Sequence, residues 1–276
     1  MSIRMIAVDL DGTLLASDSA TVPEENIRAL RRAAEKGAEI VLASGRSLVM
    51  MQDAAAQLGC VSYAVSSLGA AVTDLKTGRQ LAVQGLTPEQ RRAIIGVLAP
   101  YEPLIEVYCD NRIYVEREEL ERRPPESSFD FLRFRYDDRV DGLDAVLGER
   151  TVEKVDADFL PDTAALEDAR VKLEAMGGLH VLTYPCHLHM EVSDAGATKS
   201  SGMQALCGYL GIAAEEVLAL GDSDNDLDLF AWAGSSVAMA NGSPLARQGA
   251  DMVTVSNDEG GVARGVEALM DRIGNS

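Results

Sequence analysis

Apolar and polar positions follow a regular order in the first 75 residues. Residues 5–8 form a continuous apolar run, which is typical of a strand buried on both faces of a parallel sheet. Apolar residues then recur at helical spacing up to Gly37, and Thr21 and Glu24 have the spacing of a capping box that would start this helix. A strand, a helix and a third strand are predicted next, at 39–43, 47–58 and 63–66. This β-α-β-α-β order predicts an α/β fold with a doubly wound, Rossmann-like parallel sheet.

The pattern changes after Gly69. Short apolar runs predict hairpins, with strands at 70–73, 80–83, 105–109 and 112–115. A capped helix starting near Thr87 separates the two hairpins, and a strand, a helix and a strand follow at 151–155, 163–176 and 179–183. Mixed elements between parallel units predict an inserted α+β domain over 85–186, within a core made of 1–84 and 187–276.

The first pattern is expected to return at His187. A helix at 199–210 and a strand at 217–220 follow, and further strands at 236–239 and 251–255 complete the predicted sheet. His187 and His189 lie on one face of the strand that begins this part. Their spacing is interpreted as that of a solvated or packed strand rather than of a metal site.

Composition narrows the classes of partner. The 276 residues include 44 acidic and 25 basic ones, and a net charge of −19 argues against nucleic acid or an anionic membrane as a partner. The four cysteines are widely scattered, so they predict neither a zinc site nor a disulfide framework. The chain shows no signal sequence and no apolar segment long enough to span a bilayer, which predicts a cytoplasmic protein. Its oligomeric state stays open.

Two carboxylates stand at the end of the first predicted strand. Asp9 and Asp11 follow the run 5–8, at the sheet edge where α/β proteins bind ligands, and Gly12 allows close approach to the backbone. Crowded carboxylates repel each other unless a cation or a hydrogen-bond network offsets the repulsion. We therefore expect a metal here; the alternative is an Asx-type turn after a strand in an acidic protein.

Other strand ends supply complementary groups, namely Ser44, Gly45, Asp222, Asn225 and Asp226, and Lys199 opens a helix. Oxygen ligands of this kind favour Mg²⁺, and the hydroxyl, the backbone N–H, the ammonium and the amide are suited to holding phosphate oxygens. The set predicts phosphoryl transfer. Asp222-x-Asp224-x-Asp226 also matches the start of an EF-hand loop, but Leu227 and Ala233 occupy the positions of its Gly and Glu, which excludes that motif.

These residues carry a family resemblance. Asp9-Leu10-Asp11-Gly12-Thr13, Ser44-Gly45-Arg46, Lys199 and Gly221-Asp222-Ser223-Asp224-Asn225-Asp226 resemble, in order, the four motifs of the HAD (haloacid dehalogenase-like) phosphatases. The most similar subgroup is the Cof-type branch, with a type IIB cap between the second and third motifs. The resemblance covers nearly all of 1–75 and 188–270, and only the domain pattern of the inserted part.

The resemblance implies roles for these residues. Asp9 would be the nucleophile that forms an aspartyl-phosphate, and Asp11 the general acid and base. Mg²⁺ would be held by Asp9, the backbone carbonyl of Asp11, and Asp222, with Asp226 and Thr13 supporting these ligands. Ser44, Gly45, Lys199 and Asn225 would bind phosphate, and Lys199 would also offset the charge of Asp9. The expected function is hydrolysis of a small phosphorylated metabolite, such as a sugar phosphate.

Two other functions remain open within this interpretation. A phosphomutase would return the phosphoryl group to a sugar hydroxyl, and a non-catalytic phosphoacceptor or phosphate-sensing module would keep its aspartyl-phosphate to regulate a partner. Two positions are less defined. Leu68 stands where Cof-type relatives commonly carry Asn, so the usual polar contact is missing, and Arg46 is equally well explained as a surface side chain.

Overall fold

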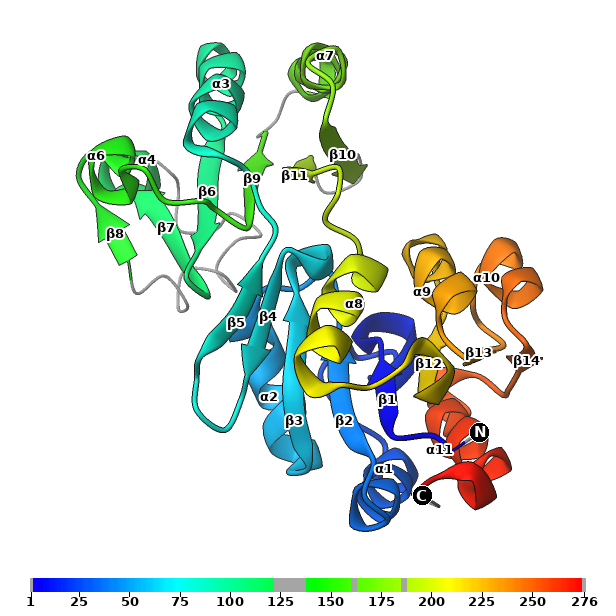
Figure 1. The fold of residues 1–276 in the computed structure, drawn as a ribbon. Coiled ribbons are helices and arrows are strands. Elements are labelled where there is room, and N and C mark those ends of the chain that lie inside the picture. The colour runs from blue at the N-terminus through cyan, green and yellow to red at the C-terminus, as the bar shows by residue number, and fades with distance from the viewer. Residues whose placement is uncertain (1, 122–137, 160–162, 185–187, 275–276) are drawn as a thin grey trace. The chain divides into compact units, whose positions relative to one another are not determined.

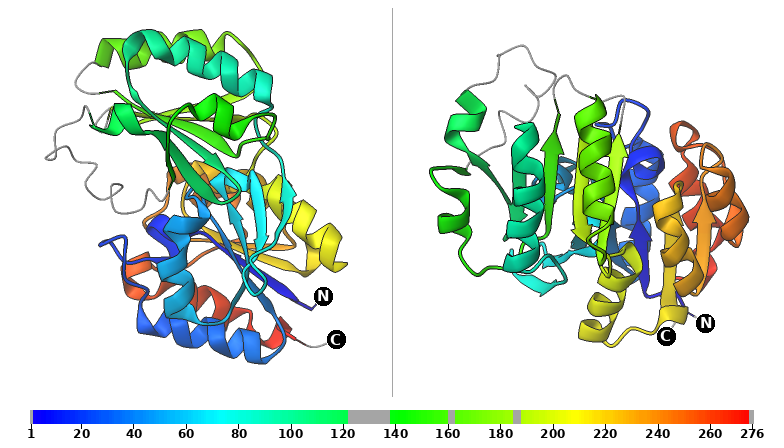
Figure 2. Two further views of the ribbon diagram at one scale, coloured as in Figure 1. Left: turned by 90° about the vertical axis from the view of Figure 1, so that its left-hand side faces the viewer. Right: turned by 90° about the horizontal axis from the view of Figure 1, so that it is seen from above.

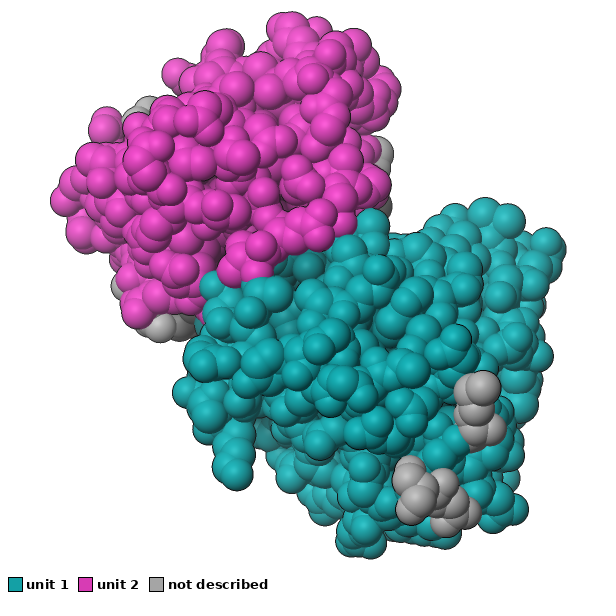
Figure 3. Space-filling view, in the orientation of Figure 1, with its two compact units in different colours: residues 1–82, 198–276 teal, residues 83–197 magenta. Residues whose placement is uncertain are grey.

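The computed structural model describes residues 2–121, 138–159, 163–184 and 188–274. The chain forms two compact units, Met1–Ala82 with Thr198–Ser276, and Val83–Ala197. We call the first the core unit and the second the inserted unit; Figure 3 colours them separately. No helix in the described ranges is both long enough and apolar enough to cross a membrane.

The core unit is built on a sheet with the strand order β14-β13-β12-β1-β2-β3-β4-β5 (Figure 1). Neighbouring strands from β14 to β3 are parallel, and β4 runs antiparallel to β3. The bounds are β1 (Met5–Val8), β2 (Glu39–Ala43), β3 (Val61–Ser66), β4 (Ala71–Asp74), β5 (Gln80–Val83), β12 (Val217–Gly221), β13 (Ser235–Ala238) and β14 (Met252–Val253). The predicted parallel sheet is therefore confirmed, although its last strand is shorter than expected.

Helices cover both faces of this sheet (Figures 1 and 2). They are α1 (Glu24–Glu35), α2 (Leu48–Leu58), α8 (Lys199–Leu210), α9 (Leu227–Trp232), α10 (Pro244–Gly249) and α11 (Gly261–Ala268). Along β1, Ile6 and Val8 join the apolar cluster of α1, α2 and α11, whereas Met5 and Ala7 join that of α8, α9 and α10. Two apolar faces on one strand explain the continuous apolar run in the sequence.

The expected start of α1 is wrong in one detail. Pro23 stands at its N-cap and no side chain caps the helix. The Thr21 hydroxyl donates instead to Asp18, in a local turn that competes with capping. In contrast, α2 ends as predicted, with Gly59 in the left-handed conformation at φ 65°.

The inserted unit has a sheet of its own, with the strand order β10-β11-β9-β6-β7-β8. The bounds are β6 (Leu104–Cys109), β7 (Arg112–Glu116), β8 (Asp138–Val140), β9 (Lys154–Asp158), β10 (Leu179–Tyr184) and β11 (His189–Asp194), with helices α3 (Pro88–Leu98), α4 (Arg117–Glu121), α6 (Leu143–Leu147) and α7 (Thr163–Glu174). Its pairs are antiparallel except β7 with β8. One face packs on α3 and α7 through an apolar cluster that includes Ile94, Val107, Val155 and Leu166.

The predicted helix start and hairpin turn of this unit are confirmed. A capping box between Thr87 and Gln90 starts α3. Asp110 and Asn111, with φ of 53° and 61°, form the predicted turn between β6 and β7. The strand β9, however, begins three residues later than the expected 151–155.

The second boundary of the inserted part differs from the expected one. The sequence pattern places the strand after residue 187, which is β11, in the core. In the structure β11 pairs antiparallel with β9 and β10, and the boundary between the inserted unit and the core unit falls between Ala197 and Thr198. The sequence explains this: Met190 and Val192 are buried, whereas His189 and Glu191, which alternate with them, are polar. Such alternation fits an antiparallel sheet with one helix-covered face. The first boundary falls after Ala82 rather than after residue 84. His187 lies outside the described residues.

Candidate functional site

The tight turn after β1 lies against the segment 221–226, which is the fourth motif of the sequence analysis. Asp9 follows β1 directly, and Gly12 adopts φ 76° within the turn Leu10–Leu14. A Cβ atom on Gly12 would lie 2.4 Å from Asp222 Oδ2, so only glycine allows this approach without displacing the carboxylate. The Thr13 hydroxyl donates to Asp222 Oδ1 at 2.8 Å and fixes that side chain.

Three carboxylates meet at this edge of the sheet. Asp9, Asp222 and Asp226 each offer an oxygen within 4.8 Å of the others, and all three follow β1 or β12. Oxygen donors at this spacing match the coordination that Mg²⁺ prefers. Both oxygens of Asp226 are engaged already, because Oδ1 accepts from Lys199 and Oδ2 accepts from the backbone N–H groups of Asp222 and Ser223. Asp9 and Asp222 are therefore the side chains best placed to hold a cation.

Lys199 joins this cluster from α8. Thr198 caps that helix through a capping box and sets Lys199 at its first position. The fully buried ammonium donates to Asp9 Oδ1 at 2.7 Å and to Asp226 Oδ1 at 2.6 Å. Burial raises the pKa of Asp9 to about 8, against the opposing effect of Lys199, and Asp226 and Asp222 raise it further. A carboxyl with such a pKa requires additional positive charge to stay ionised at neutral pH.

Asp11 does not join the three carboxylates through its side chain. Its half-exposed carboxylate accepts from Arg46 Nε at 2.7 Å and from Arg46 Nη2 at 2.5 Å. Arg46 also donates to the carbonyl of Ser19. The guanidinium therefore fixes the position of Asp11, and the surface interpretation of Arg46 does not account for this bidentate pair. No local pattern links two residues that are 35 positions apart.

The Ser44-Gly45-Arg46 segment is held by the turn that contains Leu68. Leu68 N–H donates to the Ser44 carbonyl at 3.1 Å, and Ser67 N–H donates to the Arg46 carbonyl at 2.8 Å. The Leu68 side chain covers Gly45, where an added Cβ would lie 3.3 Å from Leu68 Cδ2. Ser44 is buried, and its hydroxyl accepts from the N–H of Arg46. The predicted second motif is thus a rigid loop with one apolar wall.

Asn225 is the predicted site residue that is least engaged. It lies in the short turn Asp224–Asp226 after β12 and is exposed. Its Oδ1 accepts from the Ser223 hydroxyl at 2.9 Å. No hydrogen bond joins it to Asp9, Asp222 or Lys199 in the described part of the chain.

Asn241 is a further structural residue of the site. Its Nδ2 donates to the Gly12 carbonyl at 2.7 Å. Two residues later, Ser243 N–H donates to the Asp222 carbonyl at 2.7 Å, and a Cβ on Gly242 would lie 2.7 Å from that same oxygen. This segment therefore ties together the loops that carry Gly12 and Asp222.

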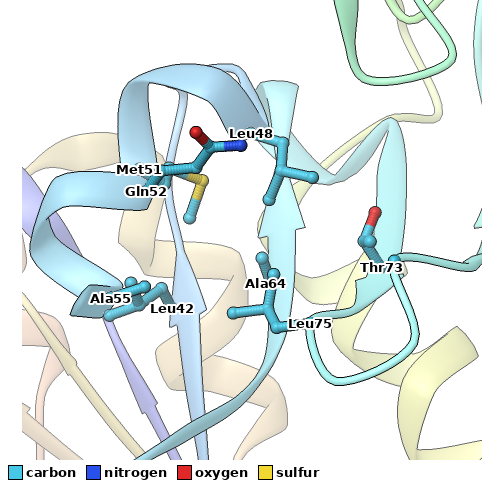
Figure 4. A pocket seen from close by; sticks show the side chains of 9 residues that line it. Leu42, Leu48, Met51, Gln52, Ala55, Ala64, Thr73 and Leu75 are labelled. Atoms are coloured by element: carbon cyan, nitrogen blue, oxygen red, sulfur yellow. The ribbon is translucent and has the colours of Figure 1, made fainter. Parts of the chain in front are cut away.

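A separate pocket lies in the core unit (Figure 4). It has a volume of about 270 Å³ and lies beside α2, with Leu42, Leu48, Met51 and Leu75 among its lining residues. Its walls are mainly apolar and include none of the predicted catalytic, metal-binding or phosphate-binding residues. The pocket is therefore distinct from the charged site at the strand ends.

Comparison with known proteins agrees with this geometry. The family model described as haloacid dehalogenase-like hydrolase matches residues 6–266. The chain is 26% identical over 274 residues to 5-amino-6-(5-phospho-D-ribitylamino)uracil phosphatase YcsE from Bacillus subtilis, which covers 96% of this chain and 95% of that protein. It is similar to a solved haloacid dehalogenase-like hydrolase from Bacteroides thetaiotaomicron, with a TM-score of 0.82, 26% identity, and 97% and 99% of the two chains covered.

A second solved structure shares the fold at lower identity. This is the HAD subclass IIB sugar phosphatase BT4131, with a TM-score of 0.77 and 20% identity over 97% of this chain and 99% of that one. At this identity the similarity shows a shared fold.

Proposed function

Because this chain belongs to the haloacid dehalogenase-like hydrolases and is a phosphatase of that family, we propose that it hydrolyses phosphomonoesters in a Mg²⁺-dependent reaction through an aspartyl-phosphate on Asp9. One observation carries the proposal. Asp9 is 5% exposed, hydrogen-bonded to the buried Lys199, and close to Asp222 at the end of β1. A purely structural turn gains nothing from burying a carboxylate whose charge must then be compensated.

Mg²⁺ would be held by Asp9, Asp222 and the backbone carbonyl of Asp11, with Thr13 and Asp226 fixing Asp222. When bound, it supplies positive charge that keeps Asp9 ionised and lowers the repulsion between carboxylates and phosphate. The oxygen-only donor set and the space kept free by Gly12 fit this ion.

The chain's own residues perform the two transfers. Asp9 Oδ attacks phosphorus as the ester P–O bond breaks, and Asp11 gives a proton to the departing alcohol oxygen. Asp11 then takes a proton from the water that attacks the acyl phosphate, which releases phosphate and restores Asp9. Arg46 fixes the position of the Asp11 carboxyl group for these proton transfers. Ser44, Gly45 N–H, Lys199 and Asn225 bind the remaining phosphate oxygens in this scheme.

For the substrate, we propose a small phosphorylated sugar or sugar alcohol. The relative YcsE is named for a phosphoribityl compound, and BT4131 is described as a sugar phosphatase. The inserted unit, Val83–Ala197, is the part of the chain to which we assign substrate selection. Phosphomutase and phosphoacceptor functions remain the alternatives.

A phosphate-release screen over a panel of sugar and sugar-alcohol phosphates, with and without Mg²⁺, tests the proposal. We expect Mg²⁺-dependent release that Asp9→Asn abolishes and that Asp224→Asn, an exposed carboxylate in the same segment as Asp222, retains. Substantial release by Asp9→Asn contradicts the nucleophile. An isomerised product without free phosphate indicates a mutase, and a long-lived phosphoenzyme with negligible turnover indicates a phosphoacceptor.

A further inference from the structure

One face of the sheet in the inserted unit packs on α3 and α7 through the apolar cluster. The other face carries a row of ionisable side chains. The strand register places Asp156 of β9 opposite Glu106 of β6 on one side and Glu191 of β11 on the other. In the next row Asp158 stands opposite His189. Asp156 and Asp158 are almost completely buried. Like charges on directly opposite positions are unfavourable, so this arrangement needs an explanation.

His189 is oriented by one carboxylate and directed toward two others. Its Nδ1 lies 2.6 Å from Asp158 Oδ1. Its Nε2 lies 3.8 Å from an oxygen of Asp156 and 3.6 Å from an oxygen of Glu191. A histidine that binds a metal typically donates its other ring N–H to a carboxylate in this way, which fixes the tautomer and the ring orientation.

We propose that His189 Nε2, Asp156 and Glu191 bind a divalent transition-metal ion of the Zn²⁺ class between β9 and β11, with Asp158 as the residue that positions His189. One ligand atom from each of the three residues lies within 4.8 Å of the others. Metal–ligand distances of about 2.0–2.2 Å place tetrahedral ligands roughly 3.3–3.5 Å apart. The observed separations of 3.6 Å and 3.8 Å from Nε2 therefore need to contract by only a few tenths of an ångström.

A second observation concerns the hydrogen bonding of Asp156. This residue is 1% exposed, and its Oδ1 has no hydrogen-bond partner within the described residues. A buried carboxylate oxygen without a partner is costly, and a metal ion that binds both oxygens of Asp156 would compensate it, since Oδ2 is the oxygen that faces His189.

Lys154 is the competing cation in this cluster. Its ammonium lies 2.8 Å from Asp156 Oδ2 and 3.3 Å from Glu191 Oε1, the two oxygens that face His189. Lys154 and the four carboxylates Glu106, Asp156, Asp158 and Glu191 carry a formal charge of three negative units, of which one divalent ion bound with neutral His189 offsets two. The mixed nitrogen and oxygen donors favour Zn²⁺ here, in contrast to the oxygen-only set of the core unit.

The site is invisible in the sequence because its ligands come from two strands about 30 positions apart. The spacing of His189 from His187 does not indicate a metal site, and Asp156 and Asp158 alternate with apolar residues as on the polar face of any strand. Only the register of β9 with β11 brings the three ligands together.

Calorimetric titration of the chelator-treated full chain with ZnCl₂, in the presence of excess Mg²⁺, tests the proposal. The titration is repeated in an Asp222→Asn background, which impairs the core cluster. We expect one Zn²⁺ equivalent that persists in Asp222→Asn and is weakened at least 100-fold by His189→Ala. Asp158→Asn should weaken it about 10- to 100-fold. His180→Ala is the matched control, since His180 is exposed on the adjacent β10, and it should leave the affinity unchanged.

Glu191→Gln keeps the proposal testable if His189→Ala does not fold. Far-UV circular dichroism first establishes that each variant is folded without metal. With Co²⁺ as the probe, the wild type and His180→Ala should show the visible absorption of a tetrahedral site, and Glu191→Gln should lose it. No Zn²⁺ equivalent in the Asp222→Asn background, or an equivalent unaffected by folded His189→Ala or Glu191→Gln, overturns the proposal.

Discussion

Replacing Lys199 by methionine tests how the core cluster is stabilised. Methionine keeps most of the side-chain length and apolar volume but removes the ammonium that donates to Asp9 and Asp226. Removing one partner of a buried ion pair typically costs about 3–5 kcal/mol, because the other charge stays buried and unpaired. Asp9, with its pKa raised to about 8, is already mostly protonated at pH 7 without metal, so the substitution leaves only the Asp226 carboxylate without its cation. We therefore expect a loss near the lower limit, about 3 kcal/mol, or roughly a 150-fold change in the unfolding equilibrium.

Urea unfolding without metal at pH 7 measures this loss. The chain has one tryptophan, Trp232 in α9, so its fluorescence reports on the core unit. The midpoint should fall while the slope of the free energy against urea stays constant. Lys76→Met is the control: Lys76 is exposed in the β4–β5 turn, and its loss should change stability by no more than about 0.5 kcal/mol.

A double-mutant cycle with Asp226→Asn separates charge neutralisation from packing. In the wild type, Asp226→Asn removes one ion pair of Lys199. In Lys199→Met it instead removes a buried carboxylate that has lost its ammonium partner, so its cost should be smaller by at least about 1 kcal/mol. Additivity of the two substitutions within about 0.5 kcal/mol would refute the view that Lys199 acts by neutralising this cluster.

Three further outcomes are expected. Gly12→Ala should lower Mg²⁺-dependent phosphate release at least about 100-fold, because its Cβ would meet Asp222 Oδ2 at 2.4 Å; unchanged kinetics would contradict this. Arg46→Ala should lower kcat about 10- to 100-fold with a smaller effect on KM. Arg46→Lys should restore little, since lysine cannot form the bidentate pair with Asp11; wild-type kcat in either variant would argue against a positioning role of Arg46. Burial raises the pKa of Cys207 to about 11. The rate at which iodoacetamide labels Cys207 in the folded protein, measured by mass spectrometry, should therefore be very low at pH 8 and rise about tenfold per pH unit. Rapid labelling of Cys207 at pH 8 would contradict its burial.

The core fold was predictable because its signals are local. Apolar runs such as residues 5–8 mark strands buried on both faces, and glycines such as Gly59 mark helix ends. The assignment of β11 failed for a physical reason. Its alternating pattern defines a strand with one buried face, but no local feature states which of the two sheets that strand joins.

The candidate site was predictable as a set of strand ends but not as a set of contacts. The motif order brought Asp9, Asp222 and Lys199 together correctly in space. The pairing of Arg46 with Asp11, and that of Asn241 with the Gly12 carbonyl across 229 positions, depend on loop conformations that only tertiary packing determines. Side-chain spacing along the sequence contains no information on such contacts.

The turn at Leu68 shows how packing overrides local preference. Ser67 and Leu68 have φ of 52° and 59°, a left-handed conformation that costs roughly 1–2 kcal/mol for each non-glycine residue. Burial of the Leu68 side chain, which is 8% exposed against the Gly45 loop, returns about 1.5–3 kcal/mol. The two N–H bonds to Ser44 and Arg46 add to this. At Gly69 a Cβ would collide with the Thr198 carbonyl, so the same strained turn fixes both the Ser44 loop and the start of α8. The strain is therefore compensated by the contacts that set Ser44 and Lys199 in position.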